Sequence, residues 1–164
     1  MESRSGVVLI IGLPGTGKTT LANRLSRLLQ WEVVSTEVVR AQLFGEKIVL
    51  EDRDFSPEEL NGTYAEVCRI VDMILQRGGG VIVDGVFRSH LQRQQVIDVV
   101  SKHDTPWLGI LTRCDEQTVI ERLRLRKKMG SISPGGEIAY SRLKHEFDPV
   151  DESFLKIDTG NHRE

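Results

Sequence analysis

The sequence predicts an α/β fold in which helices cover both faces of a five-stranded parallel sheet, giving three layers. Apolar runs rich in β-branched residues recur along the chain and alternate with segments of helical character. This alternation is typical of a parallel sheet, because each strand is joined to the next by a crossover helix. The length of 164 residues, 39% of them hydrophobic, suits a single domain over 1–164. The runs expected to form strands cover residues 7–11, 32–35, 81–84, 108–112 and 154–157.

Helix-boundary signals agree with this alternation. Ser56 is followed by Pro57 and Glu59. This pattern predicts a helix with Ser56 as N-cap, proline at the first helical position and a capping-box glutamate. The glycines at 78–80 predict the end of that helix.

Two further helices are expected in the second half of the chain. Asp115 can cap a helix that runs to about Lys128. Ser133 and Pro134 can open a last helix that ends before Pro149.

Residues 12–19 form a glycine-rich phosphate-binding motif. They follow the first apolar run and have the Walker A sequence Gly-Leu-Pro-Gly-Thr-Gly-Lys-Thr. The glycines let backbone N–H groups converge on phosphate oxygens, Lys18 supplies positive charge, and Thr19 offers a hydroxyl to Mg²⁺. The following helix directs the positive end of its dipole at the same anion. We therefore predict ATP and Mg²⁺ as cofactors, with a nucleotide-binding set of Gly12, Leu13, Pro14, Gly15, Thr16, Gly17, Lys18, Thr19 and Thr20.

A carboxylate ends another apolar run. Residues 81–84 are Val-Ile-Val-Asp, the Walker B pattern, which places Asp84 at the carboxyl edge of the sheet, where ligands bind in such folds. Asp84 and Thr19 are the predicted Mg²⁺ site, with the metal held directly or through water. The alternative is an aspartate that only forms the turn after the strand.

Polar residues follow the run 32–35 at the same edge. Glu37 could accept the proton of an attacking hydroxyl, and Arg40 could bind an anionic acceptor in bidentate fashion. The alternative is a helix start, with Ser35 or Thr36 as N-cap and Glu37 near the positive end of the helix dipole. These residues alone leave both interpretations open.

A basic helical segment provides candidate residues for closing the site. Arg122 and Arg126 lie one turn apart and could neutralise charge that develops in a phosphoryl-transfer transition state. They belong to a predicted arginine-rich lid over about 120–136. The alternative is a solvated helix face. Residues 46–55 could border the acceptor, but the sequence favours an exposed loop, and no site residue is assigned there.

The composition limits the other classes of function. A net charge of −2 and 5% aromatic residues give no overall signal for binding nucleic acid or an anionic membrane. No stretch approaches the roughly 20 apolar residues that span a bilayer, and no signal peptide is recognised, so we expect a cytoplasmic protein without membrane association. The two cysteines and four histidines form no disulfide framework or zinc-ligand spacing. No obligate protein partner is indicated.

The chain resembles the polynucleotide-kinase-like branch of P-loop kinases, which includes 5′-hydroxyl nucleic-acid kinases and is related to zeta toxins and chloramphenicol phosphotransferase. Residues 12–19 look like the P-loop of that family, and residues 35–40 look like its Ser-(Ser/Thr)-Asp-x-x-Arg segment. Residues 83–93 look like its Walker B stretch with the following arginine, and Arg122 and Arg126 lie where its lid arginines fall. The likeness covers nearly the whole chain.

This resemblance implies roles for three residues. Glu37 would be the general base that activates the acceptor hydroxyl, and Arg40 and Arg93 would bind the acceptor. Glu37 replaces the aspartate of the family, which adds one methylene group, and Gly-Val-Phe at 85–87 replaces the usual small and polar residues. For the longer Glu37 side chain, either the backbone compensates or the acceptor differs, and at 85–87 a contact to the acceptor could be lost or made apolar.

Together these features predict transfer of the γ-phosphoryl group from ATP to a hydroxyl acceptor, with Lys18, Glu37, Arg122 and Arg126 as catalytic residues. The acceptor that the resemblance favours is the 5′-hydroxyl end of a polynucleotide. The first alternative is a small molecule such as a sugar acid, a nucleotide or an antibiotic. The second is a module that hydrolyses or senses ATP without an acceptor.

Overall fold

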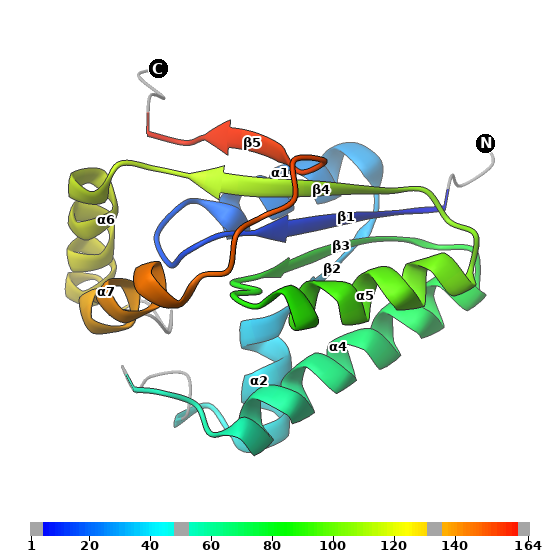
Figure 1. Ribbon diagram of the computed structural model, residues 1–164, viewed down its shortest axis with the longest axis horizontal. Coiled ribbons are helices and arrows are strands. Elements are labelled where there is room, and N and C mark those ends of the chain that lie inside the picture. The colour runs from blue at the N-terminus through cyan, green and yellow to red at the C-terminus, as the bar shows by residue number, and fades with distance from the viewer. Residues whose placement is uncertain (1–4, 48–52, 131–135, 161–164) are drawn as a thin grey trace.

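Five strands and six helices make up the part of the chain that the computed structural model describes, residues 5–47, 53–130 and 136–160 (Figure 1). Every predicted run forms a strand, and its observed bounds differ from the expected ones by no more than one residue at either end. The elements are β1 (Gly6–Ile11), α1 (Lys18–Leu29), β2 (Glu32–Ser35), α2 (Thr36–Phe44), α4 (Pro57–Gln76), β3 (Gly80–Gly85), α5 (His90–Lys102), β4 (Trp107–Arg113), α6 (Glu116–Lys128), α7 (Glu137–Glu146) and β5 (Leu155–Asp158).

The strands form one parallel sheet in the order β2-β3-β1-β4-β5, which confirms the predicted sheet. β1 lies in the centre, and all six of its residues are buried. A strand covered on both faces needs apolar side chains pointing both ways, which is why residues 7–11 are apolar without interruption. Parallel pairing also brings the carboxyl ends of all strands to one edge, where Asp84 of β3 is in register with Ile10 of β1.

Side chains of β1 alternate between two apolar clusters, one on each face of the sheet. Leu9 belongs to the cluster that contains Val71 of α4 and Val96 of α5. Ile10 belongs to the cluster that contains Ala22 of α1. α1 therefore covers one face and α4 and α5 cover the other, while α6 and α7 lie beyond the carboxyl edge, where the strand arrows end (Figure 1). The three-layer prediction is confirmed.

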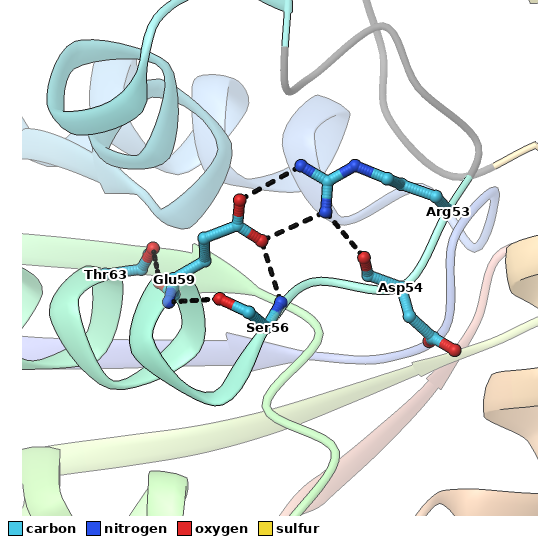
Figure 2. Close-up of polar contacts among 5 residues, drawn as sticks. All are labelled: Arg53, Asp54, Ser56, Glu59 and Thr63. Atoms are coloured by element: carbon cyan, nitrogen blue, oxygen red, sulfur yellow. Dashed lines mark hydrogen bonds and ion pairs between the residues drawn. The ribbon is translucent and has the colours of Figure 1, made fainter.

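α4 begins at the capping box that the sequence predicts. Ser56 Oγ accepts the backbone N–H of Glu59 at 3.1 Å, and Glu59 Oε2 accepts the backbone N–H of Ser56 at 2.7 Å (Figure 2). These two bonds satisfy backbone donors that have no partner within the helix. The helix ends at Gln76, just before Gly78, whose φ of 75° favours glycine.

The later helices agree in part with the sequence. Asp115 Oδ1 accepts the backbone N–H of Thr118 at 2.9 Å, and α6 ends where expected. α7 begins at Glu137, and Ser133 and Pro134, which were expected to open it, lie outside the described residues. Within the described ranges, no helix combines the length and apolar character needed to cross a membrane.

Candidate active site

The loop between β1 and α1 has the geometry of a phosphate-binding loop. Gly15 and Gly17 have φ values of 79° and 87°, which residues with a side chain rarely adopt. Thr16 anchors the loop to the sheet, because its hydroxyl donates to the carbonyl of Leu13 at 2.7 Å and lies 2.8 Å from Thr112 Oγ1 of β4. The loop leads into the amino end of α1, so its backbone N–H groups and the helix dipole favour the same anion.

Lys18 is the first residue of α1 and remains close to the loop. Its Nζ donates to the carbonyl oxygen of Leu13 at 3.0 Å. Burial lowers the pKa of Lys18, while the carboxylates of Asp84 and Glu37 act in the opposite direction. A partly desolvated ammonium group attracts a phosphate oxygen more strongly than one in bulk water. This position suits the predicted contact with the β- and γ-phosphates.

Thr19 and Asp84 meet at the carboxyl edge of the sheet. The hydroxyl of Thr19 donates to Asp84 Oδ2 at 2.9 Å, and Asp84 is buried. Burial raises the pKa of Asp84, and Lys18 opposes that shift. A hydroxyl and a carboxylate are oxygen ligands of the kind that Mg²⁺ prefers, so the donor set fits the expected metal. Bound there, Mg²⁺ would offset the negative charge of the triphosphate.

Glu37 lies in the first turn of α2, at the carboxyl edge of the sheet, where Asp84 also lies. Ser35 occupies the N-cap position in an extended conformation, but its side chain makes no capping hydrogen bond. Burial raises the pKa of Glu37 to about 7, opposed mainly by Lys18. A carboxyl group with a pKa near neutrality can exchange a proton at physiological pH. The helix-start interpretation therefore describes its backbone position, and the base interpretation suits its side chain.

A cavity of about 350 Å³ joins these groups at the carboxyl edge of the sheet. The P-loop forms one wall, and the others come from α2, residues 53–55, α4, the end of β3, α6 and α7. Basic side chains outnumber acidic ones on its surface, which favours an anionic ligand. These charged residues are Lys18, Arg40, Arg53, Arg88, Arg126 and Arg142, with Glu37, Asp54 and Asp84.

Part of this wall comes from residues to which the sequence analysis assigns no role in the site. Residues 53–55 were expected to be exposed, and Arg53 and Asp54 are, but Phe55 is half-buried with the guanidinium of Arg40 stacked 4.1 Å from its ring centroid. An aromatic residue immediately before a predicted N-cap is a sign of contact with the protein body that could have been noticed. Arg142 belongs to no recognisable sequence motif. It reaches the cavity only because of the way α7 packs.

Two arginines on this wall each have a buried nitrogen atom that makes no hydrogen bond. Among the described residues, Arg40 Nε and Arg142 Nε are the buried side-chain nitrogen or oxygen atoms that have no hydrogen-bond partner. Arg40 is only 5% exposed. A buried N–H group without an acceptor is costly, so such groups usually have a partner in the functional state. Both nitrogens belong to side chains that line the same cavity.

The two lid arginines have separate positions. Arg122 donates to the carbonyl of Gly15 at 3.3 Å and to the carbonyl of Thr159 at 2.7 Å, so it fastens the P-loop to the segment after β5. Arg122 itself does not line the cavity, although it contacts Gly15, which does, and its closing over the triphosphate stays a prediction. Arg126 does line the cavity, and its catalytic role stays a prediction. Residues 131–135 of the predicted lid lie outside the described residues.

Arg93, the other predicted acceptor-binding residue, is held within the protein. It is 3% exposed, and its guanidinium donates to four backbone carbonyl oxygens. These belong to Phe87 at 2.8 Å, Arg88 at 3.0 Å, Asp148 at 2.9 Å and Pro149 at 2.9 Å. The side chain therefore joins the segment after β3 to the segment after α7, and its donors are occupied by the protein itself.

We expect Arg93→Gln to lower the free energy of unfolding by about 3 kcal/mol, because several buried carbonyl oxygens would lose their donor. Urea denaturation would measure this. Arg24→Gln is the matched control, since Arg24 is exposed on α1, and it should change stability by less than about 0.5 kcal/mol. A stable Arg93→Gln protein with a raised KM for the acceptor would restore the original interpretation.

Comparison with known proteins identifies the family of this chain. Residues 7–150 match the family described as AAA domain. The chain belongs to this family. It is 33% identical over 157 residues to a protein of Aeropyrum pernix named a probable adenylyl-sulfate kinase, covering 95% of this chain and 84% of that protein. An uncharacterised protein of Mycobacterium tuberculosis is 36% identical over 165 residues, which cover 96% of this chain but only 32% of that longer protein.

Solved kinases share the fold of this AAA domain protein. The APS kinase of Mycobacterium tuberculosis in complex with AMPPNP and APS has a TM-score of 0.69 at 17% identity, covering 95% of this chain and 89% of that chain. A gluconokinase from Sinorhizobium meliloti has a TM-score of 0.71 at 13% identity, covering 93% and 82%. The protein is a P-loop kinase, as predicted. These kinases are named for small-molecule substrates, and the polynucleotide-kinase-like branch is not confirmed.

Proposed function

We propose that this AAA domain kinase transfers the γ-phosphoryl group of ATP to a hydroxyl group of a small anionic molecule. The observation that carries this proposal is that Arg40 and Arg142 line one cavity and that the buried Nε atom of each has no hydrogen-bond partner. Arginine forms strong charge-assisted bonds with carboxylate, sulfate and phosphate oxygens. An acidic group on the acceptor would supply the missing partners.

The size of the cavity supports a small acceptor. Its volume of about 350 Å³ lies at the low end of the range for small-molecule sites, about 300–1,000 Å³. Part of that space adjoins the P-loop and would hold the phosphates of ATP. The names of the similar kinases agree with this class, since adenylyl sulfate and gluconate are both small anions that carry hydroxyl groups.

Each step of this phosphoryl transfer can be assigned to residues at the cavity. The acceptor hydroxyl oxygen would attack the γ-phosphorus, and its proton would pass to the Glu37 carboxylate. The bond from that phosphorus to the β,γ-bridging oxygen would break, and ADP would leave with the electron pair. Lys18 and the loop N–H groups would hold the phosphates, while Thr19 and Asp84 would hold Mg²⁺. Arg126 would add positive charge beside the transferred group.

The proposal is tested by following ADP formation with a panel of acceptors. Gluconate and adenylyl sulfate represent anionic acceptors, glucose is the uncharged match to gluconate, and a 5′-hydroxyl oligonucleotide represents the polynucleotide class. We expect ADP formation that requires an anionic small molecule, with no stimulation by glucose. Transfer to the oligonucleotide alone would overturn the proposal in favour of a polynucleotide kinase. ADP formation that no hydroxyl compound stimulates would overturn it in favour of an ATP-hydrolysing module.

A further inference from the structure

The segment just before α4 is fastened to that helix on one side of the cavity. Arg53 forms a bidentate ion pair with Glu59, with both N···O distances at 3.0 Å, and also donates to the carbonyl oxygen of Asp54 at 2.7 Å. Glu59 completes the capping box with Ser56 at the same time (Figure 2). The main chain of Asp54 is therefore held in place by a charged network at the start of α4.

The side chain of Asp54 points away from this network, as Figure 2 shows. Its Oδ1 lies 2.7 Å from Arg142 Nε of α7, so an ion pair connects two sides of the cavity. The contact lacks hydrogen-bond geometry, because Arg142 Nε still has no hydrogen-bond partner. Asp54 thus neutralises the charge of Arg142 without satisfying its buried N–H group.

The two members of this pair differ in their access to solvent. The side chain of Asp54 is 67% exposed, whereas that of Arg142 is 25% exposed. Asp54 can return to water at little cost, and ion pairs with an exposed member are weak. Arg142 is less accessible, so losing its acidic partner costs Arg142 more than it costs Asp54. Another anion can therefore replace the Asp54 carboxylate as the partner of Arg142.

We infer that Asp54 is an internal counter-ion that occupies the anion subsite on Arg142 until the acidic group of the acceptor displaces it. The inference rests on the proposed function, because it assigns the residue that binds the anionic group of the acceptor. The Arg53–Glu59 pair would keep the main chain of this segment fixed while the Asp54 side chain turns to solvent. Asp54 would thereby lower the affinity for anions and make Arg142 selective for ligands that bind better than a single carboxylate.

Sulfate binding tests this arrangement without any phosphoryl transfer. The protein would be saturated with Mg²⁺ and AMPPNP, so that the P-loop is filled, and sulfate would be titrated by calorimetry. We expect Asp54→Asn to bind sulfate about two- to fivefold more tightly, because the competing carboxylate is gone. Arg142→Gln should weaken sulfate binding about tenfold or more. Asp104→Asn removes the same charge at an exposed site before β4, and it should leave sulfate affinity unchanged.

The double variant separates local competition from a general charge effect. In an Arg142→Gln background, Asp54→Asn should no longer change sulfate affinity, because the two residues act on one subsite. If Arg142→Gln does not fold, Arg142→Met serves as the background, since methionine keeps much of the apolar stem and removes the charge. Equal tightening by Asp54→Asn in both backgrounds, or no tightening at all, would overturn the inference. The sulfate titrations do not require a known acceptor. Failure of this inference can therefore be distinguished from failure of the proposed function, which the ADP assay tests.

Discussion

Lys18→Ala is expected to lower kcat for phosphoryl transfer by about 10²–10³-fold or more, because the γ-phosphate would lose the cation that stabilises charge in the transition state. The fold should persist. Lys18 makes a hydrogen bond to the Leu13 carbonyl, but burial works against its charge, as the lowered pKa shows. Removing Lys18 relieves that desolvation cost, although Asp84 and Glu37 then lose a nearby positive charge. Steady-state kinetics and urea denaturation of the same preparation would measure both effects.

Lys102→Ala is the control for this experiment, since Lys102 is an exposed residue in the last turn of α5. Its kcat should match that of the wild type. Wild-type turnover in Lys18→Ala would contradict the assignment of the P-loop as the catalytic nucleotide site. A loss of activity accompanied by unfolding would instead make Lys18 a structural residue.

Glu37→Gln is expected to reduce kcat by about 10²–10⁴-fold with little change in ATP affinity, because the amide cannot accept the proton of the acceptor hydroxyl. Glu37→Asp is the matched variant, since it keeps the carboxylate and removes one methylene group. It should retain more activity than Glu37→Gln. An unchanged rate in Glu37→Gln would leave Glu37 as a residue of the helix start only.

The raised pKa of Glu37 gives this prediction a pH dependence. The wild-type kcat/KM should fall as the pH decreases below about 7, where the carboxyl becomes protonated and can no longer act as a base. Glu37→Gln should lack this dependence. A wild-type profile that stays flat between pH 5 and pH 8, values that bracket this pKa of about 7, would contradict the role of Glu37 as the base.

The same shift predicts an opposite effect on stability. Because the folded-state pKa of about 7 lies above the ordinary value of 4.5, the native protein binds the proton more tightly than the unfolded chain does. Stability should therefore fall as the pH rises from 4.5 through 7, and above that range Glu37→Gln should be more stable than the wild type by up to about 3 kcal/mol. Denaturation of both proteins at several pH values without Mg²⁺ would measure this difference in the free energy of unfolding.

Local sequence patterns were sufficient for the framework of the protein. The apolar run 7–11 predicts a central strand, because only a strand covered on both faces needs apolar residues at every position. Ser56 and Glu59 predict the start of α4, since both capping bonds join residues three apart. The P-loop and the approach of Thr19 to Asp84 follow from motifs whose spacing reflects backbone geometry.

The sequence by itself therefore determined the sheet, the P-loop and the class of chemistry, because these depend on backbone conformation and on neighbours a few residues apart. Only the tertiary structure decided the use of individual arginines. Arg93 and Arg122 bind carbonyl oxygens of segments that are distant in sequence, while Arg142 and Asp54 meet on the cavity wall. A guanidinium group can bind a ligand, a carboxylate or the main chain equally well by its chemistry. The partner of each arginine depends on how α5, α6 and α7 pack, and local sequence patterns do not predict this packing.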